Sequence, residues 1–308
     1  EARPTSILPP PVGRTEARPT NAARIGVALF AAILAIAPLG AHASPPSFAD
    51  VKSGYVSSDA VLLDRHGAPL SGTRVDAKLR RLDWVTLAEV SPAMSAALVA
   101  AEDQRFWEHG GVDWAGLAAA AWDSVWRVVD GRRPRGGSTI TMQLAGLIDP
   151  ALRPKGGDAR TLAQKRDQAG AALEIEQAWT KSEILEAYLN LSSYRGELKG
   201  LRAAAQGLFA KSPEGLDARE SAILVALLRQ PGAKPSLVAQ RACAVANTVT
   251  PGADCESIRA TATMALAGAY RMPPRWNLAP HLAAKLLKTP GERLATTLDA
   301  ELQAFAVA

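Results

Sequence analysis

The stretch from Ala101 to Asp113 holds the residues of this chain that are best suited to acid–base chemistry. Ser91 and Pro92 predict a helix start upstream, because serine caps helices and proline fits the first helical turn. That helix carries four residues at a spacing of four on one face: Met94, Leu98, Glu102 and Phe106. A carboxylate in such an apolar stripe is poorly hydrated, which suits Glu102 to act as a general base or acid near neutral pH. The alternative is a structural pairing of Glu102 with Arg105 at the helix end.

A second stretch, residues 132–143, combines glycine with positive charge. Gly136 and Gly137 lead into a helix that Ser138 or Thr139 can cap. Three arginines lie just upstream: Arg132, Arg133 and Arg135. Exposed backbone N–H groups, the positive end of a helix dipole and nearby guanidinium groups together form an anion site, with phosphate as the obvious ligand. An ordinary junction between a loop and a helix is the alternative.

The composition indicates a folded and mostly helical protein. Of 308 residues, 48% are hydrophobic and 21% are charged, which suffices for one large or two modest domains. Aromatic residues make up only 5%, and the abundance of alanine and leucine favours helices over a β-sandwich. The net charge of +5 fits an acidic surface or a phosphate-bearing substrate. We expect no nucleic-acid partner, since zinc-finger spacing, RNA-binding aromatic motifs and long Lys/Arg tracts are all missing.

The N-terminal part of the sequence predicts an anchored or exported protein. Residues 1–24 are rich in Pro, Arg and Thr and are expected to be a disordered tail. Residues 25–43 carry no charge and follow several arginines, which predicts a single transmembrane helix or an export signal with its basic end in the cytoplasm. The strongly apolar part, 25–37, is shorter than the roughly 20 residues that span a bilayer, so both choices stay open. Either one places the following residues outside the inner membrane.

The helical body is expected between residues 86 and 235. Capping boxes predict two helix starts, at Thr180 with Glu183 and at Asp217 with Glu220. The helix after Asp217 is so apolar that it should lie in the core.

The regions on either side of this body are expected to be linkers. Residues 44–85 contain a strand, a turn and a returning strand, which predicts a short β-hairpin linker. Residues 236–308 predict a helical linker that ends in a strand without a partner, residues 294–299. Cys243 and Cys255 flank the joint of this linker, either as one disulfide or as two separate thiols.

Four groups of residues follow one another in order. The first is Glu102, Asp103, Phe106, His109, Gly111 and Asp113, and the second is the run 136–143. The third is Lys181, Ile184-Leu185-Glu186 and Tyr188-Leu189-Asn190, and the fourth is Gly200-Leu201 with Ala204-Ala205. The series resembles the motifs of peptidoglycan glycosyltransferase family 51, the polymerase module of class A penicillin-binding proteins. Met142 and the Leu-Ile-Asp-Pro run after it are most similar to the 1C subtype.

The resemblance implies a lysozyme-like helical glycosyltransferase lobe with a small jaw that lies partly in the membrane. The implied substrate is lipid II, whose disaccharide units are joined with inversion into a growing glycan chain during cell wall synthesis. The module would lie on the periplasmic side of the inner membrane, with other cell wall synthases as candidate partners. In the family a penicillin-binding transpeptidase follows, and residues 296–299 resemble its opening strand.

The resemblance also implies a role for individual residues. Glu102 would be the catalytic base, and Asp103 and His109 are expected to orient the loop behind it. The implied substrate-binding residues are Asp103, Phe106, His109, Gly137, Ser138, Thr139, Gln143, Arg160, Lys165 and Gln168. The helix start at 136–141 and Arg160 would stabilise the leaving pyrophosphate. Some members use a divalent cation, Mg or Mn, but this sequence has no clear ligand set for a metal or another cofactor.

Two positions depart from the family pattern. The family's second glutamate falls on Gln168, which cannot ionise, although the 1C subtype shares this glutamine. A cation that commonly follows the second motif falls on Gly146, and three residues are candidates to replace it: Arg153, Lys165 and Arg166. Two alternative functions therefore remain, a catalytically weak lipid II-binding or scaffold module and a lysozyme-like enzyme that cleaves glycan with a single acid.

Overall fold

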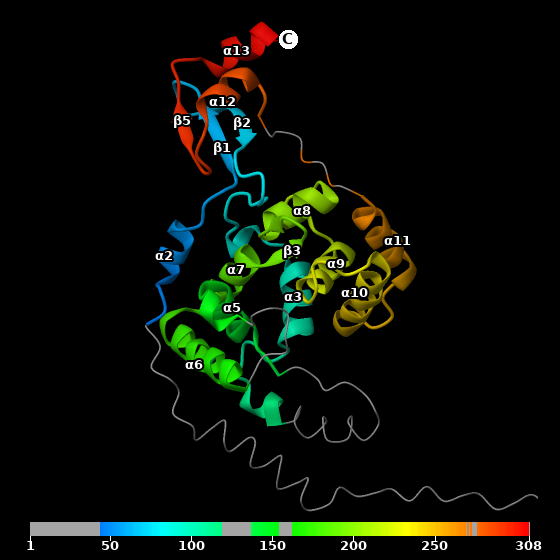
Figure 1. Ribbon diagram of the computed structural model, residues 1–308. Helices are drawn as coiled ribbons and strands as arrows, with labels where there is room; N and C mark the ends of the chain where they lie inside the picture. The colour runs from blue at the N-terminus through cyan, green and yellow to red at the C-terminus, as the bar shows by residue number, and fades with distance from the viewer. Residues whose placement is uncertain are drawn as a thin grey trace, which may run out of the picture. The chain divides into compact units, whose positions relative to one another are not determined.

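The computed structural model describes residues 44–118, 137–153, 162–268, 270, 272 and 276–307. The predicted tail, the apolar segment 25–43 and four of the arginines named above lie outside these residues: Arg132, Arg133, Arg135 and Arg160. The described part is mostly helical, as the composition predicts (Figure 1). Within it, no helix is both long enough and apolar enough to cross a membrane.

Every labelled helix and strand belongs to one compact unit, which comprises Leu39–Trp114 and Gly137–Ala308.

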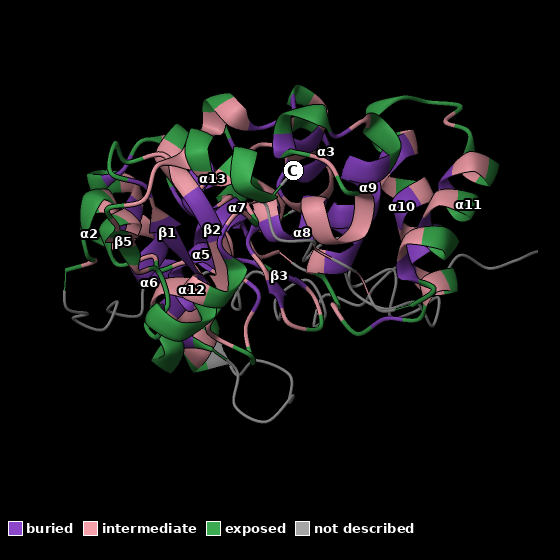
Figure 2. Cartoon of the chain, turned by 90° about the horizontal axis from the view of Figure 1, so that it is seen from above, coloured by how far each residue is buried: buried purple, intermediate pink, exposed green. Residues whose placement is uncertain are grey.

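The main body is a group of packed helices. In chain order they are α3 (Pro92–Glu102), α5 (Ile140–Ile148), α6 (Leu162–Ala178), α7 (Lys181–Leu191), α8 (Leu201–Phe209), α9 (Ala218–Leu228), α10 (Pro235–Val249) and α11 (Cys255–Leu266). Helix α9 is central, since every residue from Glu220 to Leu227 is buried and the helix packs against α3, α10 and α11 (Figure 2). Helix α5 packs against α6 and α7, which forms the other half of the same hydrophobic core.

Both predicted capping boxes are confirmed. Thr180 and Glu183 exchange hydrogen bonds at the start of α7, and Asp217 and Glu220 do so at the start of α9. Before α8, Leu198–Lys199 forms strand β4, which pairs with β3 (Ser193–Arg195). Short 3₁₀ turns connect the helices at η1 (Leu87–Glu89), η2 (Pro150–Leu152) and η3 (Pro213–Gly215).

A small sheet takes residues from both ends of the described chain. After α2 (Phe48–Ser53), strands β1 (Asp59–Leu63) and β2 (Pro69–Arg74) pair antiparallel. Strand β5 (Arg293–Ala295) lies parallel to β1, so the expectation that the last strand has no partner is wrong. Helix α12 (Pro280–Leu286) covers β2, and α13 (Ala300–Val307) ends the described chain. Cys243 and Cys255 form a disulfide between α10 and α11.

Candidate active site

Helix α3 places Glu102 at its last residue. The Ser91 side chain caps the helix by accepting a hydrogen bond from the Ala93 backbone N–H, and Pro92 occupies the first turn, as the sequence predicts. Met94 and Leu98 are fully buried on the face that leads to Glu102. Phe106 is also fully buried, but it lies in the turn after the helix, since α3 ends at Glu102.

Both oxygens of the Glu102 carboxylate accept hydrogen bonds. Gln143 Nε2 donates to Oε2 at 3.1 Å, and Arg229 Nε donates to Oε1 at 3.0 Å. The Glu102 side chain is only 9% exposed. The alternative, a pairing of Glu102 with Arg105, does not occur, because Arg105 forms a bidentate pair with Asp113. The expectation of purely apolar surroundings is wrong as well, because the carboxylate lies between an amide and a guanidinium group.

The Gln143 amide is itself held in one orientation. Tyr188 Oη on α7 donates to Gln143 Oε1 at 2.9 Å, which leaves the amide nitrogen facing Glu102. The chain of hydrogen bonds thus runs from α7 through α5 to the end of α3. These hydrogen bonds hold the Glu102 carboxylate in one position even when no ligand is bound. A general base needs such a fixed position.

Arg229 is the functional residue that the sequence reasoning missed. It directly follows α9, and besides contacting Glu102 it donates through Nη2 to the Ala101 carbonyl oxygen at 3.1 Å. Its side chain is 59% exposed, so the guanidinium group is accessible beside the carboxylate. A distance of 127 residues along the chain separates it from Glu102, and no local pattern marks the pair.

Asp103 occupies the anion site that was predicted for phosphate. Its carboxylate accepts from the Ile140 backbone N–H at 3.0 Å and contacts His109 Nε2 at 2.9 Å. Thr139 caps the same helix by accepting from the Met142 backbone N–H. The Ile140 N–H group is therefore used by an internal carboxylate at the positive end of the α5 dipole, and the Met142 N–H group is used by the Thr139 hydroxyl oxygen. Gly137 and Ser138 lead into this start and are half-buried.

The loop between Asp103 and Asp113 is fixed from several sides. Lys181 Nζ donates to the His109 carbonyl oxygen at 2.6 Å and lies 4.4 Å from the centre of the Phe106 ring. The Gly111 carbonyl oxygen accepts from Thr139 Oγ1 at 2.6 Å. The side chains of Asp103, Phe106 and His109 are almost fully buried, so they shape the loop from within.

Residues of the third motif contact two different parts of the protein, the segment around Val85 and the side chain of Gln143. The Glu186 carboxylate accepts hydrogen bonds from Lys52, Trp84 and the Leu87 backbone, and Asn190 pairs with both backbone groups of Val85. These contacts fix the segment before η1, whereas Tyr188 on the same helix faces Gln143.

The remaining predicted residues within the described ranges lie on α6. Gln168 is 1% exposed and donates through Nε2 to the Leu152 carbonyl oxygen at 2.6 Å. Lys165 is exposed on α6. In the described ranges, no group of three or more His, Cys, Asp or Glu side chains is arranged to hold a metal ion.

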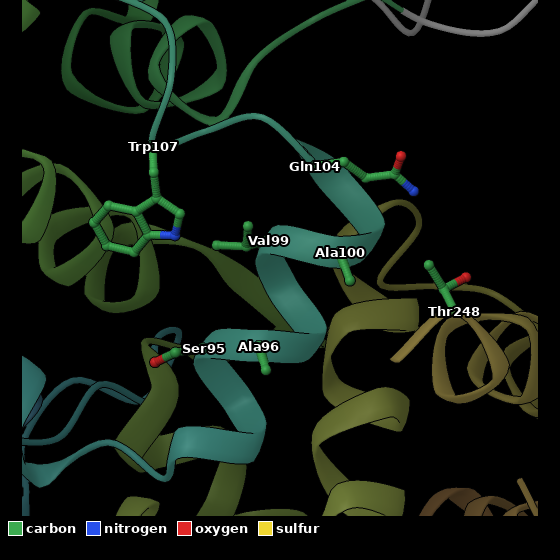
Figure 3. A pocket seen from close by; sticks show the side chains of 7 residues that line it. All are labelled: Ser95, Ala96, Val99, Ala100, Gln104, Trp107 and Thr248. Carbon is green, nitrogen blue, oxygen red and sulfur yellow. The ribbon is translucent and has the colours of Figure 1, made fainter. Parts of the chain in front are cut away.

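A groove of about 410 Å³ crosses the outer face of α3 (Figure 3). Figure 3 shows Trp107 on one side of the helix and Thr248 on the other, with small side chains of α3 between them. The lining residues are Ser95, Ala96, Val99, Ala100, Gln104, Trp107 and Thr248. Glu102 is not among them.

Comparisons with known proteins agree with the motif order. A family model described as Transglycosylase matches residues 68–250. Penicillin-binding protein 1C of Escherichia coli K12 is 35% identical over 228 residues, which cover 71% of this chain and 28% of that protein. Biosynthetic peptidoglycan transglycosylases of Rhodospirillum centenum and Cronobacter sakazakii are each 38% identical, over 54% and 48% of this chain and 68% and 58% of their own lengths.

A solved structure, that of penicillin-binding protein 1A from Haemophilus influenzae, aligns over 82% of this chain and 28% of that chain. The sequence identity is 16% and the TM-score is 0.35, a similarity too low to carry an argument.

Proposed function

Because the chain belongs to the transglycosylase family, we propose that it is a peptidoglycan glycosyltransferase. It polymerises lipid II into glycan strands, with inversion at the donor sugar and release of undecaprenyl pyrophosphate. The observation that carries the proposal is the Glu102 carboxylate, held between Gln143 and Arg229 at the end of α3. Three of the family motifs meet there, since Glu102, Gln143 and Tyr188 each come from a different one.

In the proposed reaction, Glu102 removes the proton of the acceptor's GlcNAc 4-hydroxyl. The hydroxyl oxygen forms a bond to the anomeric carbon of the donor's MurNAc, and the bond from that carbon to the phosphate oxygen breaks on the opposite face. The electron pair leaves with the pyrophosphate, and the proton remains on Glu102 until water takes it. Each Glu102 oxygen accepts one hydrogen bond from the protein, and its second lone pair is available for the hydroxyl.

Gln143 and Arg229 orient the base. The amide donates to one carboxylate oxygen and the guanidinium group to the other, so the side chain keeps one position. Because neither group can remove a proton itself, the assignment of the base falls on Glu102 alone in this cluster.

We further propose a lysozyme-like lobe with a membrane-associated jaw, on the periplasmic side of the inner membrane. The uncharged segment 25–43 after an arginine-rich tail supports an anchor. The disulfide between Cys243 and Cys255 supports an oxidising compartment, since cytosolic thiols stay reduced.

The test is incubation of the detergent-solubilised chain with fluorescent lipid II, and separately with preformed glycan strands. The proposal predicts products of increasing length from lipid II and no shortening of preformed strands. Shortening of the strands without polymer would show a lysozyme-like enzyme. Lipid II binding without any product would show a binding or scaffold module, and either result would overturn the proposal.

A further inference from the structure

Gly146 lies three residues beyond Gln143 on α5, towards the C-terminal end of the helix. A Cβ atom at this position would lie 3.3 Å from Gln168 Nε2 and 3.8 Å from the Leu152 carbonyl oxygen. A Cβ atom at 146 would therefore lie tightly against the buried Gln168 amide. With glycine at this position, α5 presents no cation from residue 146 itself.

Arg153 crosses the same place from the turn that follows. Its Cγ lies 4.0 Å from the position of a Cβ at residue 146. Its Nε donates to the Gly146 carbonyl oxygen, and its Nη2 donates to the Leu147 carbonyl oxygen at 2.8 Å. An arginine seven residues further along the chain thus brings a positive charge to the side of α5 where Gly146 has no side chain.

Gln168 holds the turn that carries Arg153. Its Nε2 donates to the carbonyl oxygen of Leu152, the residue directly before Arg153, while its Oε1 is buried and has no hydrogen-bond partner among the described residues. A glutamate at 168 would face the Leu152 carbonyl with an acceptor instead of a donor. The amide is therefore the group that fits this turn.

The cations here lack an acidic partner. Across the described ranges no carboxylate pairs with Arg153, whose side chain is exposed. Burial, together with the charges of Arg81 and Arg153, lowers the pKa of half-buried Lys199 on β4. Repulsion among neighbouring cations is relieved when an anion binds.

We propose that Arg153 binds the anionic diphosphate of the substrate, in place of a side chain at 146, and that Gln168 is the residue that positions it. The inference deepens the proposed function and rests on it. Arg153 forms the binding contact, and Gln168 acts only through the turn at Leu152.

The first experiment compares the kinetics of wild type, Arg153→Ala and Arg153→Lys with lipid II. Loss of a hydrogen bond to a charged group predicts an apparent KM about 10- to 100-fold higher for Arg153→Ala, with a smaller change in kcat. Arg153→Lys keeps the charge and should recover part of the loss. The matched control is Arg219→Ala, because Arg219 is paired with Asp217 at the start of α9, and its KM should change by less than about twofold. An Arg153→Ala variant no different from this control would overturn the proposal.

A double-mutant cycle tests the positioning role. Gln168→Glu should raise the KM, and Gln168→Glu with Arg153→Ala should be no worse than Arg153→Ala alone, because both changes remove one contact. Thermal unfolding of each variant shows whether the fold is retained. If Gln168→Glu does not fold, the KM values of Arg153→Lys and Arg153→Ala still test the role of Arg153. Additive effects of the two changes would show that Gln168 does not act through Arg153.

Binding separates this inference from the proposed function. Fluorescence anisotropy of labelled undecaprenyl pyrophosphate, titrated with the detergent-solubilised chain, measures the contact without turnover. If the wild type makes no polymer but binds the diphosphate, and Arg153→Ala abolishes this binding, the polymerase function is refuted and the anion contact is supported. If the wild type makes polymer, and Arg153→Ala has the same diphosphate binding and the same KM, only the inference about Arg153 is refuted.

Discussion

Glu102 can act as a base only while its carboxylate keeps one position at the end of α3. The structure provides this through hydrogen bonds from two other elements, α5 with Gln143 and the end of α9 with Arg229. Tyr188 adds a further link, since its hydroxyl group fixes the Gln143 amide. The position of one carboxylate thus depends on side chains from three other parts of the chain, α5, α7 and the end of α9.

Replacing Tyr188 by phenylalanine tests this link. The change removes the hydrogen bond to Gln143 Oε1, so the amide and the carboxylate should hold their positions less well. We expect kcat for lipid II polymerisation to fall about 3- to 10-fold, the equivalent of one ordinary hydrogen bond, with KM nearly unchanged.

Tyr194→Phe is the matched control for that change. Tyr194 is fully buried, and its hydroxyl group donates to the Leu189 carbonyl oxygen, with no contact to Gln143 or Glu102. It should lower stability without lowering kcat. Equal kcat values for the two variants would show that the Tyr188 hydroxyl group does not orient the base.

At the residue scale, the sequence could identify only those site residues that lie within local motifs. Glu102, Gln143 and Tyr188 all lie in motif runs, but their hydrogen-bond chain is a property of the packed helices. Arg229 has no such signal, because its partner lies 127 residues away. The anion site at the start of α5 was predicted correctly as a positive helix end, yet Asp103 fills it, and the sequence cannot show which anion occupies such a site.

At the scale of elements, the loop from Asp103 to Asp113 depends on one glycine. Gly111 has a φ of +91°, and a Cβ there would lie 2.6 Å from the Ala172 carbonyl oxygen on α6. Gly111→Ala should therefore destabilise the fold by about 1–3 kcal/mol, through overpacking and backbone strain. Urea denaturation followed by far-UV circular dichroism measures this change.

Gly110→Ala is the neighbouring control, since a Cβ at Gly110 would have no atom within 4 Å and its φ is not positive. It should change the free energy of unfolding by less than about 0.5 kcal/mol. If both variants were equally stable, the close approach between the loop and α6 would not constrain the loop.

The disulfide ties α10 to α11, and α10 packs against the central helix α9. Its loop is short, with a sequence separation of 12 residues, so loop-closure entropy predicts a loss of about 3 kcal/mol on removing it. Cys243→Ser with Cys255→Ser should lower the melting temperature, and reducing agent should lower that of the wild type only. An unchanged melting temperature in both cases would contradict a stabilising role.

Elements with local signals could be predicted from the sequence. The helix starts at Thr180 and Asp217 were predictable because a capping box lies within four residues. The parallel pairing of β5 with β1 was not, because it joins residues near opposite ends of the described chain. For the same reason, the sequence of residues 44–85 indicated only a hairpin linker, whereas β1 of this segment also pairs with the distant strand β5.

At the scale of the whole molecule, a side-chain cluster joins the small sheet to the β3–β4 turn. Arg74 of β2 forms a bidentate pair with Glu197, and the Tyr270 hydroxyl group donates to the same carboxylate. The hydrogen bond from Arg74, followed by that from Tyr270, lowers the pKa of Glu197 below its ordinary value of 4.5. Burial and the contact with Glu197 raise the pKa of Tyr270 to about 12.

This cluster predicts a dependence of stability on acid. A carboxyl group whose pKa is lower in the folded state binds fewer protons there than in the unfolded state, so it stabilises the fold above pH 4.5. That contribution should be lost as the pH falls from 4.5 through the lowered pKa. The difference in unfolding free energy between wild type and Glu197→Gln, measured from pH 7 to pH 2, should shrink over this range. A constant difference would contradict the role of the ionised carboxylate.

The central claim, that Glu102 is the base of a polymerase, is tested most directly by the rate of Glu102→Gln with fluorescent lipid II. The variant keeps the shape of the side chain and removes its ability to take a proton, which predicts a 10²- to 10⁴-fold lower kcat. Glu108→Gln, an exposed glutamate in the same stretch, should polymerise at the wild-type rate. A Glu102→Gln variant that polymerises as fast as Glu108→Gln would show that another group is the base.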